Sequence, residues 1–156
     1  MKRRQTIPRQ WLVADDRIGE GLWRAVRRLP PGSGVLFLFS GVPKGERARL
    51  LARVRRLARA RMLLVVDEMA DGAARVHGLA ELRKAQLAGA SLLFLSPMFP
   101  TRSHPDWKPL ERMRASSMVR LANRPVIALG GMNARRFRQV EPLGFSGWAG
   151  IDAYGH

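Results

Sequence analysis

Short apolar runs alternate along this chain with longer segments in which apolar residues recur every three or four positions. The short runs predict strands buried on both faces, and the periodic segments predict helices with one buried side. The predicted strands are Trp11–Ala14, Val35–Phe39, Met62–Val66, Ser91–Leu95, Pro125–Leu129 and Gly147–Ile151, with a less regular one near Arg75–Gly78. The predicted helices are Glu20–Leu29, Lys44–Arg61, Leu79–Ala88, Leu110–Ala122 and Ala134–Pro142. This alternation predicts an α/β fold with a mainly parallel sheet.

The length and composition favour a single folded domain over residues 1–156, because the chain is 46% hydrophobic and long enough to bury a core. It contains no cysteine, which excludes disulfides and zinc sites built on cysteine. The basic start, Met1–Gln5, is not followed by an apolar segment, and no apolar run approaches the roughly 20 residues of a membrane span. We therefore expect a cytoplasmic protein without a signal peptide or a membrane span.

The net charge of +16 favours anionic partners, and only four of the 28 basic residues are lysine. Arginine suits phosphate groups because its planar fork bonds two oxygens at once. We expect phosphorylated small molecules as partners, and the charge does not exclude a homo-oligomer. RNA binding is an alternative, but the chain has no interleaved aromatic surface of the kind that single-strand binders use. The arginines also fit the plainer interpretation of solvent-facing helices.

Polar and glycine-rich segments follow several predicted strands, where barrel enzymes place their sites. Gly130 and Gly131 can turn backbone N–H groups toward an anion, and Asn133 is a natural N-cap for the helix that follows. The last predicted strand, ending at Ile151 and Asp152, is expected beside this turn. Two adjacent loops of this kind predict a phosphate site, although Gly-Gly alone is consistent with a simple turn.

A proline-rich loop carries further candidates, because its hydroxyl, guanidinium and imidazole groups bind phosphate or a heteroaromatic ring. Its candidates are Ser96, Thr101, Arg102, Ser103 and His104. Asp67 ends the third strand and could hold Mg²⁺ with substrate phosphates, or could simply form a cap or turn. His77 could carry a proton, although a lone histidine is also consistent with a structural role.

Three segments resemble the thiamine phosphate synthase and thiazole tautomerase family. Residues 89–101, Gly-Ala-Ser-Leu-Leu-Phe-Leu-Ser-Pro-Met-Phe-Pro-Thr, resemble the family's Gly-Ala-Asp strand and its Gly/Ser-Pro-Val-Phe-Pro-Thr loop. Residues 125–132, Pro-Val-Ile-Ala-Leu-Gly-Gly-Met, are similar to its Pro-Val-Val-Ala-Ile-Gly-Gly-Ile strand, and residues 144–153 resemble its closing strand and phosphate loop. The segments occur in the family's order and spacing.

The resemblance implies a TIM-type (β/α)₈ barrel, which the chain length suggests is shortened by about one βα unit. It implies a transferase of thiamine biosynthesis that joins hydroxymethylpyrimidine diphosphate to thiazole phosphate and releases pyrophosphate, with Mg²⁺ as cofactor. It also implies that Thr101 contacts the reacting phosphates, and that Gly130, Gly131, Ile151 and Asp152 cradle the thiazole phosphate.

The N-terminal half departs from the family pattern. The second strand ends in Phe37–Gly41 without the family's cationic pyrophosphate-binding cluster, and of the third strand's Asn-Asp end only Asp67 is present. The segment Val76–Glu81 fits the tautomerase branch, in which His77 would carry the proton. A thiazole tautomerase-like enzyme and a catalytically inactive thiazole-phosphate-binding homologue are therefore alternatives to the synthase.

Overall fold

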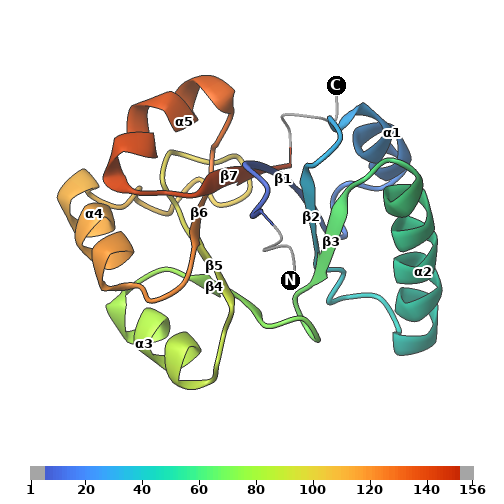
Figure 1. Ribbon diagram of the computed structural model, residues 1–156, viewed down its shortest axis with the longest axis horizontal. Coiled ribbons are helices and arrows are strands. Elements are labelled where there is room, and N and C mark those ends of the chain that lie inside the picture. Colours follow the sequence, from blue (N-terminus) through green and yellow to red (C-terminus); the bar gives the residue numbers. More distant parts are fainter. Residues whose placement is uncertain (1–5, 152–156) are drawn as a thin grey trace.

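A computed structural model describes residues 6–151, in which seven strands alternate with helices (Figure 1). The strands are β1 (Gln10–Ala14), β2 (Gly34–Phe37), β3 (Leu64–Asp67), β4 (Ala73–Val76), β5 (Leu92–Leu95), β6 (Val126–Leu129) and β7 (Gly147–Gly150). The helices are α1 (Gly21–Arg28), α2 (Lys44–Ala60), α3 (Leu79–Leu87), α4 (Arg112–Leu121), α5 (Ala134–Val140) and the 3₁₀ helix η1 (Glu141–Leu143). The alternation predicted from the apolar pattern is thus confirmed.

The seven strands form one parallel sheet in the order β3-β2-β1-β7-β6-β5-β4, which wraps into a nearly closed barrel. Strands β1 and β7, the first and last in the described residues, pair directly, with Trp11 opposite Ala149. Helices α1 and α2 cover β2 and β3 on one side, and α3, α4 and α5 cover the other side (Figure 1). This is the predicted TIM-type barrel, shortened by one unit.

The structure also shows where the missing βα unit lies, which the sequence did not determine. Every other pair of consecutive strands is joined by a connection that includes a helix, whereas only residues 68–72 join β3 to β4. Within the described residues, no strand ladder joins these two strands, and they form the two edges of the sheet. An ion pair between Glu68, just after β3, and Arg75, in β4, spans this seam at 2.6 Å. The missing unit therefore lies between β3 and β4.

Alternate residues of the strands fill the barrel interior. Trp11 and Phe94 meet edge to face there, with ring centroids 5.5 Å apart. The indole of Trp11 lies over Gly34, where an added Cβ would come within 2.2 Å of the ring, and its Nε1 donates to the Pro8 carbonyl at 2.8 Å. A large aromatic side chain from β1 thus occupies space left by a glycine in β2 and packs against Phe94 in the barrel interior.

Several element boundaries differ from those predicted, among them the starts of β4 and α4. Strand β4 begins at Ala73, two residues before the predicted start, because it pairs in register with β5. Helix α4 begins at Arg112 because the Leu110 N–H is bonded to the Pro97 carbonyl at 2.8 Å, which keeps that residue in the preceding loop. As predicted, the Asn133 side chain caps α5 by accepting a hydrogen bond from the Arg136 N–H at 2.8 Å.

No helix in residues 6–151 combines the length and apolar character that crossing a bilayer requires.

Candidate functional site

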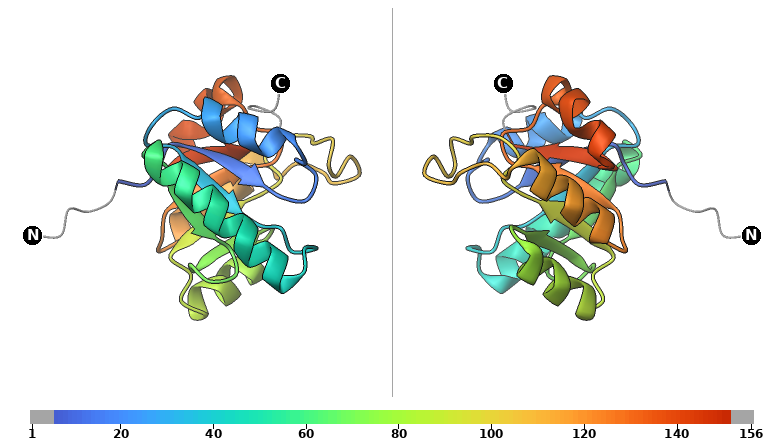
Figure 2. Two further views of the ribbon diagram at one scale, coloured as in Figure 1. Left: turned by 90° about the vertical axis from the view of Figure 1, so that its right-hand side faces the viewer. Right: turned by 90° about the vertical axis from the view of Figure 1, so that its left-hand side faces the viewer.

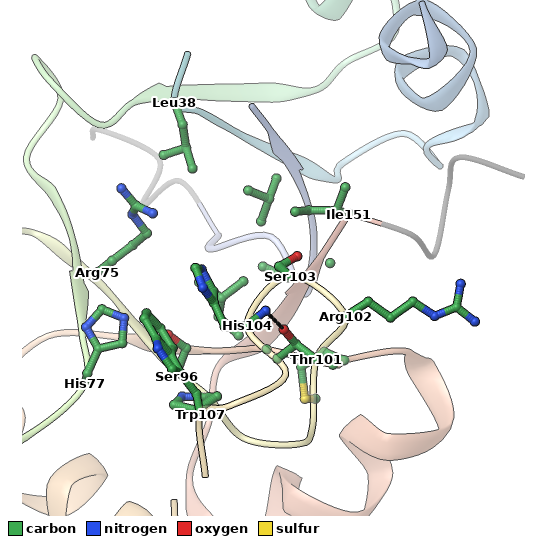
Figure 3. A pocket seen from close by; sticks show the side chains of 18 of the residues that line it. Leu38, Arg75, His77, Ser96, Thr101, Arg102, Ser103, His104, Trp107 and Ile151 are labelled. Atoms are coloured by element: carbon green, nitrogen blue, oxygen red, sulfur yellow. Dashed lines mark hydrogen bonds between the residues drawn. The ribbon is translucent and has the colours of Figure 1, made fainter. Parts of the chain in front are cut away.

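A pocket of about 750 Å³ opens at the carboxyl ends of the strands (Figure 3). The size is within the range of small-molecule sites. Nine of the predicted site residues line it together: His77, Ser96, Thr101, Arg102, Ser103, His104, Gly130, Gly131 and Ile151. Asp152 lies outside the described residues, and Asp67 does not line the pocket. The loops after β5, β6 and β7 thus converge on one pocket.

The two glycines after β6 allow the proline-rich loop to pack closely against this strand end. Met98 N–H donates to the Leu129 carbonyl at 3.0 Å, and Phe99 N–H donates to the Gly130 carbonyl at 3.1 Å. Gly130 and Gly131 both have positive φ, and a Cβ on Gly131 would lie 2.4 Å from the Pro100 carbonyl oxygen. Close loop packing therefore requires glycine here, in addition to any role in binding an anion.

Arg136 fastens these two loops to each other. Its Nη1 donates to the Gly131 carbonyl at 2.5 Å, and its guanidinium lies 5.0 Å from the centre of the Phe99 ring. The side chain also lines the pocket, so one arginine of α5 both supports the wall and adds positive charge to it. Arg136 was not among the predicted site residues, because nothing in the sequence distinguishes it from the other arginines of the helix.

An aromatic cluster forms another part of the pocket lining. Trp107 stacks on His104 with ring centroids 3.9 Å apart, and His77 meets Trp107 edge to face at 5.1 Å (Figure 3). His77 Nδ1 lies 3.1 Å from Glu81 Oε2, so a carboxylate in the first turn of α3 orients the imidazole. Trp107 was not among the predicted site residues, although it stands in the loop that supplied most of them.

Thr101 lies in the proline-rich loop and stabilises its tip. Its hydroxyl accepts a hydrogen bond from the His104 N–H at 3.0 Å, which closes a turn at the tip of the loop. This segment projects from the body of the barrel between β5 and α4 (Figure 2). The Arg102 side chain extends away from the other labelled side chains of the pocket (Figure 3). Thr101 therefore shapes the loop, whereas the guanidinium of Arg102 is directed outward.

Two further arginines, Arg75 and Arg17, also line the pocket. Neither was predicted as a site residue from the sequence. Arg75 belongs to β4, where Ala73 packs in the barrel interior and Val76 outside it, so Arg75 faces inward. Arg17 follows β1 and is bonded to Asp15, with Nε to Oδ2 at 2.9 Å. The inward alternation of β4 could have revealed Arg75 had its boundary been predicted correctly.

Asp67, the predicted metal ligand, is the carboxylate of a buried ion pair. Arg47 Nη2 donates to its Oδ1 at 2.6 Å, Arg47 Nη1 donates to its Oδ2 at 3.3 Å, and the Met69 N–H donates to Oδ1 at 3.0 Å. The Arg47 hydrogen bonds hold the pKa of the Asp67 carboxyl below its usual value, although burial alone would raise it.

These contacts test whether the site fits magnesium. Both oxygens of Asp67 already accept from Arg47, and residues 6–151 contain no group of three or more histidine or acidic side chains placed to hold a metal ion. Mg²⁺ takes oxygen ligands in near-octahedral geometry, usually including one or two carboxylates. The donors in the described part of the chain do not fit this ion, and the assignment of Asp67 as its ligand is not supported.

Known proteins match the half of the chain that builds most of the pocket. The family model described as "Thiamine monophosphate synthase" matches residues 73–154, more than half of the chain. The chain belongs to the thiamine monophosphate synthase family. The match starts at the first residue of β4, so the strands before the seam lie outside it.

Curated relatives match about half of the chain. The putative thiamine-phosphate synthase 2 of Aquifex aeolicus is 33% identical over 78 residues, which are 50% of this chain and 42% of the relative. The thiamine-phosphate synthase of Pyrococcus horikoshii is 32% identical over 80 residues, 51% of this chain and 39% of the relative. The matched part therefore spans about two fifths of these relatives.

Solved structures show that the fold extends to the N-terminal strands. The thiamine phosphate pyrophosphorylase of Pyrococcus furiosus superposes with a TM-score of 0.76 at 21% identity, covering 96% of this chain and 88% of that one. A FabK (M276A) mutant from Thermotoga maritima superposes with a TM-score of 0.57 at 15% identity, covering 95% of this chain and 62% of that one. At these identities the likeness concerns the barrel architecture.

Proposed function

We propose that this protein is a thiamine phosphate synthase-like transferase, which joins hydroxymethylpyrimidine diphosphate to thiazole phosphate and releases pyrophosphate. The observation that carries the proposal is the convergence of the loops after β5, β6 and β7 on one pocket, in the part of the chain that matches the family. The pocket combines polar groups for phosphate with aromatic surface for a heterocycle, the two features that such substrates share.

The two sides of the pocket suggest how a substrate would lie. The turn at Gly130 and Gly131, with Thr101 and Ser103 nearby, would receive the azole phosphate through backbone N–H groups and hydroxyls. The cluster of His77, His104 and Trp107 offers ring faces and edges to a heterocycle. These assignments are supported by the shared pocket and by the resemblance of the loops.

The reaction needs no nucleophile from the protein. The thiazole nitrogen would form a C–N bond to the methylene carbon of the pyrimidine, while the bond from that carbon to the diphosphate oxygen breaks. Pyrophosphate would leave with the electron pair, and cationic groups would stabilise the charge that develops on it. The residues would act by orienting two substrates and excluding water from the reacting carbon.

Pyrophosphate release provides the test. The purified chain should release pyrophosphate when both substrates are supplied and not when either one is omitted. Release should fall by at least about tenfold in His104→Ala, since that substitution removes one ring of the aromatic cluster. An absence of release at high protein concentration, with and without Mg²⁺, would refute the transferase proposal.

A second candidate is a thiazole tautomerase-like proton transfer. It is favoured by the contact of His77 Nδ1 with Glu81 Oε2, because a carboxylate that orients an imidazole is a common arrangement for proton carriers. The proton would leave the azole ring for His77 Nε2 and return at another ring position. Isomerisation of a thiazole carboxylate phosphate, followed by ring-proton exchange in D₂O, would detect it, and an unchanged rate in His77→Gln would exclude His77.

A further inference from the structure

We infer that this chain binds the diphosphate of its substrate through guanidinium groups and without a divalent cation held by the protein. The inference rests on the proposed function, because it concerns the same pocket and a diphosphate substrate. Three observations carry it: the acidic residues at and after the end of β3 are paired with arginines, Arg47 is held by several hydrogen bonds, and Arg75 and Arg17, two of the arginines that line the pocket, are each oriented by a carboxylate.

Every acidic side chain in the connection from β3 to β4 is paired with an arginine. Asp67 is bound by Arg47, and Asp71 lies 3.4 Å from Arg55. Glu68 accepts two hydrogen bonds from Arg75, at 2.6 and 2.9 Å. A cation that entered this corner of the barrel would compete with a guanidinium for the carboxylate it bound.

The most buried of these pairs is also the most constrained. Side-chain exposure is 11% for Arg47 and 6% for Asp67. Arg47 also donates from Nε and Nη2 to the Leu38 carbonyl, at 3.1 and 2.9 Å, and lies 4.8 Å from the centre of the Phe37 ring. Arg47 thus neutralises Asp67 with a charge that is part of the chain, which is the effect a bound cation would have.

Arg75 and Arg17, which both line the pocket, are likewise each held by a neighbouring carboxylate. Arg75 binds Glu68 through Nε and Nη2, and Arg17 binds Asp15 through Nε and Nη2. Neither Nη1 donates to another residue within the described part of the chain. Each guanidinium is therefore oriented by one edge while the N–H groups of Nη1 stay available for an anion.

The net charge of the chain also favours binding of a diphosphate without a divalent cation. A net charge of +16 favours the approach of a free diphosphate and opposes that of a divalent cation. An arginine already positioned by a carboxylate also loses less side-chain freedom when the anion binds. We therefore assign the diphosphate to the part of the pocket lined by Arg75 and Arg17.

Calorimetric titration of the full chain with inorganic pyrophosphate tests the inference. Pyrophosphate should bind in EDTA, and excess Mg²⁺ should leave the affinity unchanged or weaken it by complexing the anion. Arg75→Gln should lower the affinity at least about tenfold, the equivalent of about 1.4 kcal/mol, whereas Arg83→Gln, on the exposed side of α3, should leave it unchanged. Titration with Mn²⁺, followed by electron paramagnetic resonance, should show no tightly bound ion.

Binding of pyrophosphate only when Mg²⁺ is present, or a tight Mn²⁺ site, would overturn the inference, as would wild-type affinity in Arg75→Gln. If Arg75→Gln unfolds, Arg75→Lys and Arg17→Gln test the same pocket wall. Turnover is measured separately. Pyrophosphate binding in EDTA without turnover would leave the inference standing and refute the synthase proposal. Turnover combined with pyrophosphate binding that strictly requires Mg²⁺ would support the synthase proposal and refute the inference.

Discussion

Arg47 and Asp67 form a pair of hydrogen bonds that uses both carboxylate oxygens, with Nη2 to Oδ1 at 2.6 Å and Nη1 to Oδ2 at 3.3 Å. The pair joins the first turns of α2 to the end of β3, one of the two edges of the sheet. Asp67 also accepts the Met69 N–H, which begins the short connection across the missing unit. A side-chain pair therefore holds the strand end that an adjacent strand would otherwise support.

Removing the guanidinium should destabilise the protein strongly. Arg47→Met leaves the Asp67 carboxylate buried without its partner, which typically costs about 3–5 kcal/mol. Urea denaturation followed by circular dichroism measures the free energy of unfolding. Arg49→Met, an exposed position on the same helix, should change it by less than about 0.5 kcal/mol. A similar small change in Arg47→Met would mean that the pair contributes little.

The same pair predicts how stability depends on pH. The folded protein lowers the pKa of Asp67, so the contribution of the pair is complete above the unfolded pKa, about 3.9. As pH falls through the lower folded pKa, the carboxyl is protonated and this contribution is lost. Asp67→Asn should therefore flatten the fall in unfolding free energy below about pH 4. Asp106→Asn, at an exposed loop position, should keep the wild-type slope.

Gly131→Ala should disrupt the site more than a comparable glycine substitution elsewhere. A Cβ at Gly131 would lie 2.4 Å from the Pro100 carbonyl oxygen, and the residue has a φ of +61°. Gly89 has a φ of +82° and no atom within 4 Å of an added Cβ. Gly89→Ala should thus cost only the left-handed backbone penalty, about 1–2 kcal/mol. Gly131→Ala should cost more and should also weaken binding of thiazole phosphate, measured by calorimetry.

Trp107 should contribute to binding of the heterocycle. Its ring stacks on His104 and meets the edge of His77, so Trp107→Ala removes the centre of the cluster. We expect the affinity for thiazole phosphate to fall by up to about tenfold, as for the loss of one aromatic contact. Trp107→Phe should retain most of it, and Met113→Ala, at an exposed position in α4, should be neutral. Equal affinity of Trp107→Ala and the wild type would remove Trp107 from the site.

The local pattern of residues was enough to predict most of the barrel. Apolar runs such as Val35–Phe39 and amphipathic segments such as Lys44–Arg61 predict buried strands and covering helices wherever they lie in a chain. The loop candidates from Ser96 to His104 line the pocket, because they directly follow a strand and barrel strands place their carboxyl ends at one mouth. Their role in binding substrate stays a prediction.

The partners of charged residues were decided only by the tertiary structure. Asp67 stands at a strand end, where a carboxylate can bind a metal, but α2 brings Arg47 against it from 20 positions away. Arg75 is one arginine among many in the sequence, and it faces the pocket because β4 pairs with β5 in a particular register. The alternation of apolar residues is a local property that determines the elements, whereas charge pairing depends on which elements meet, and that depends on the packing of the whole chain.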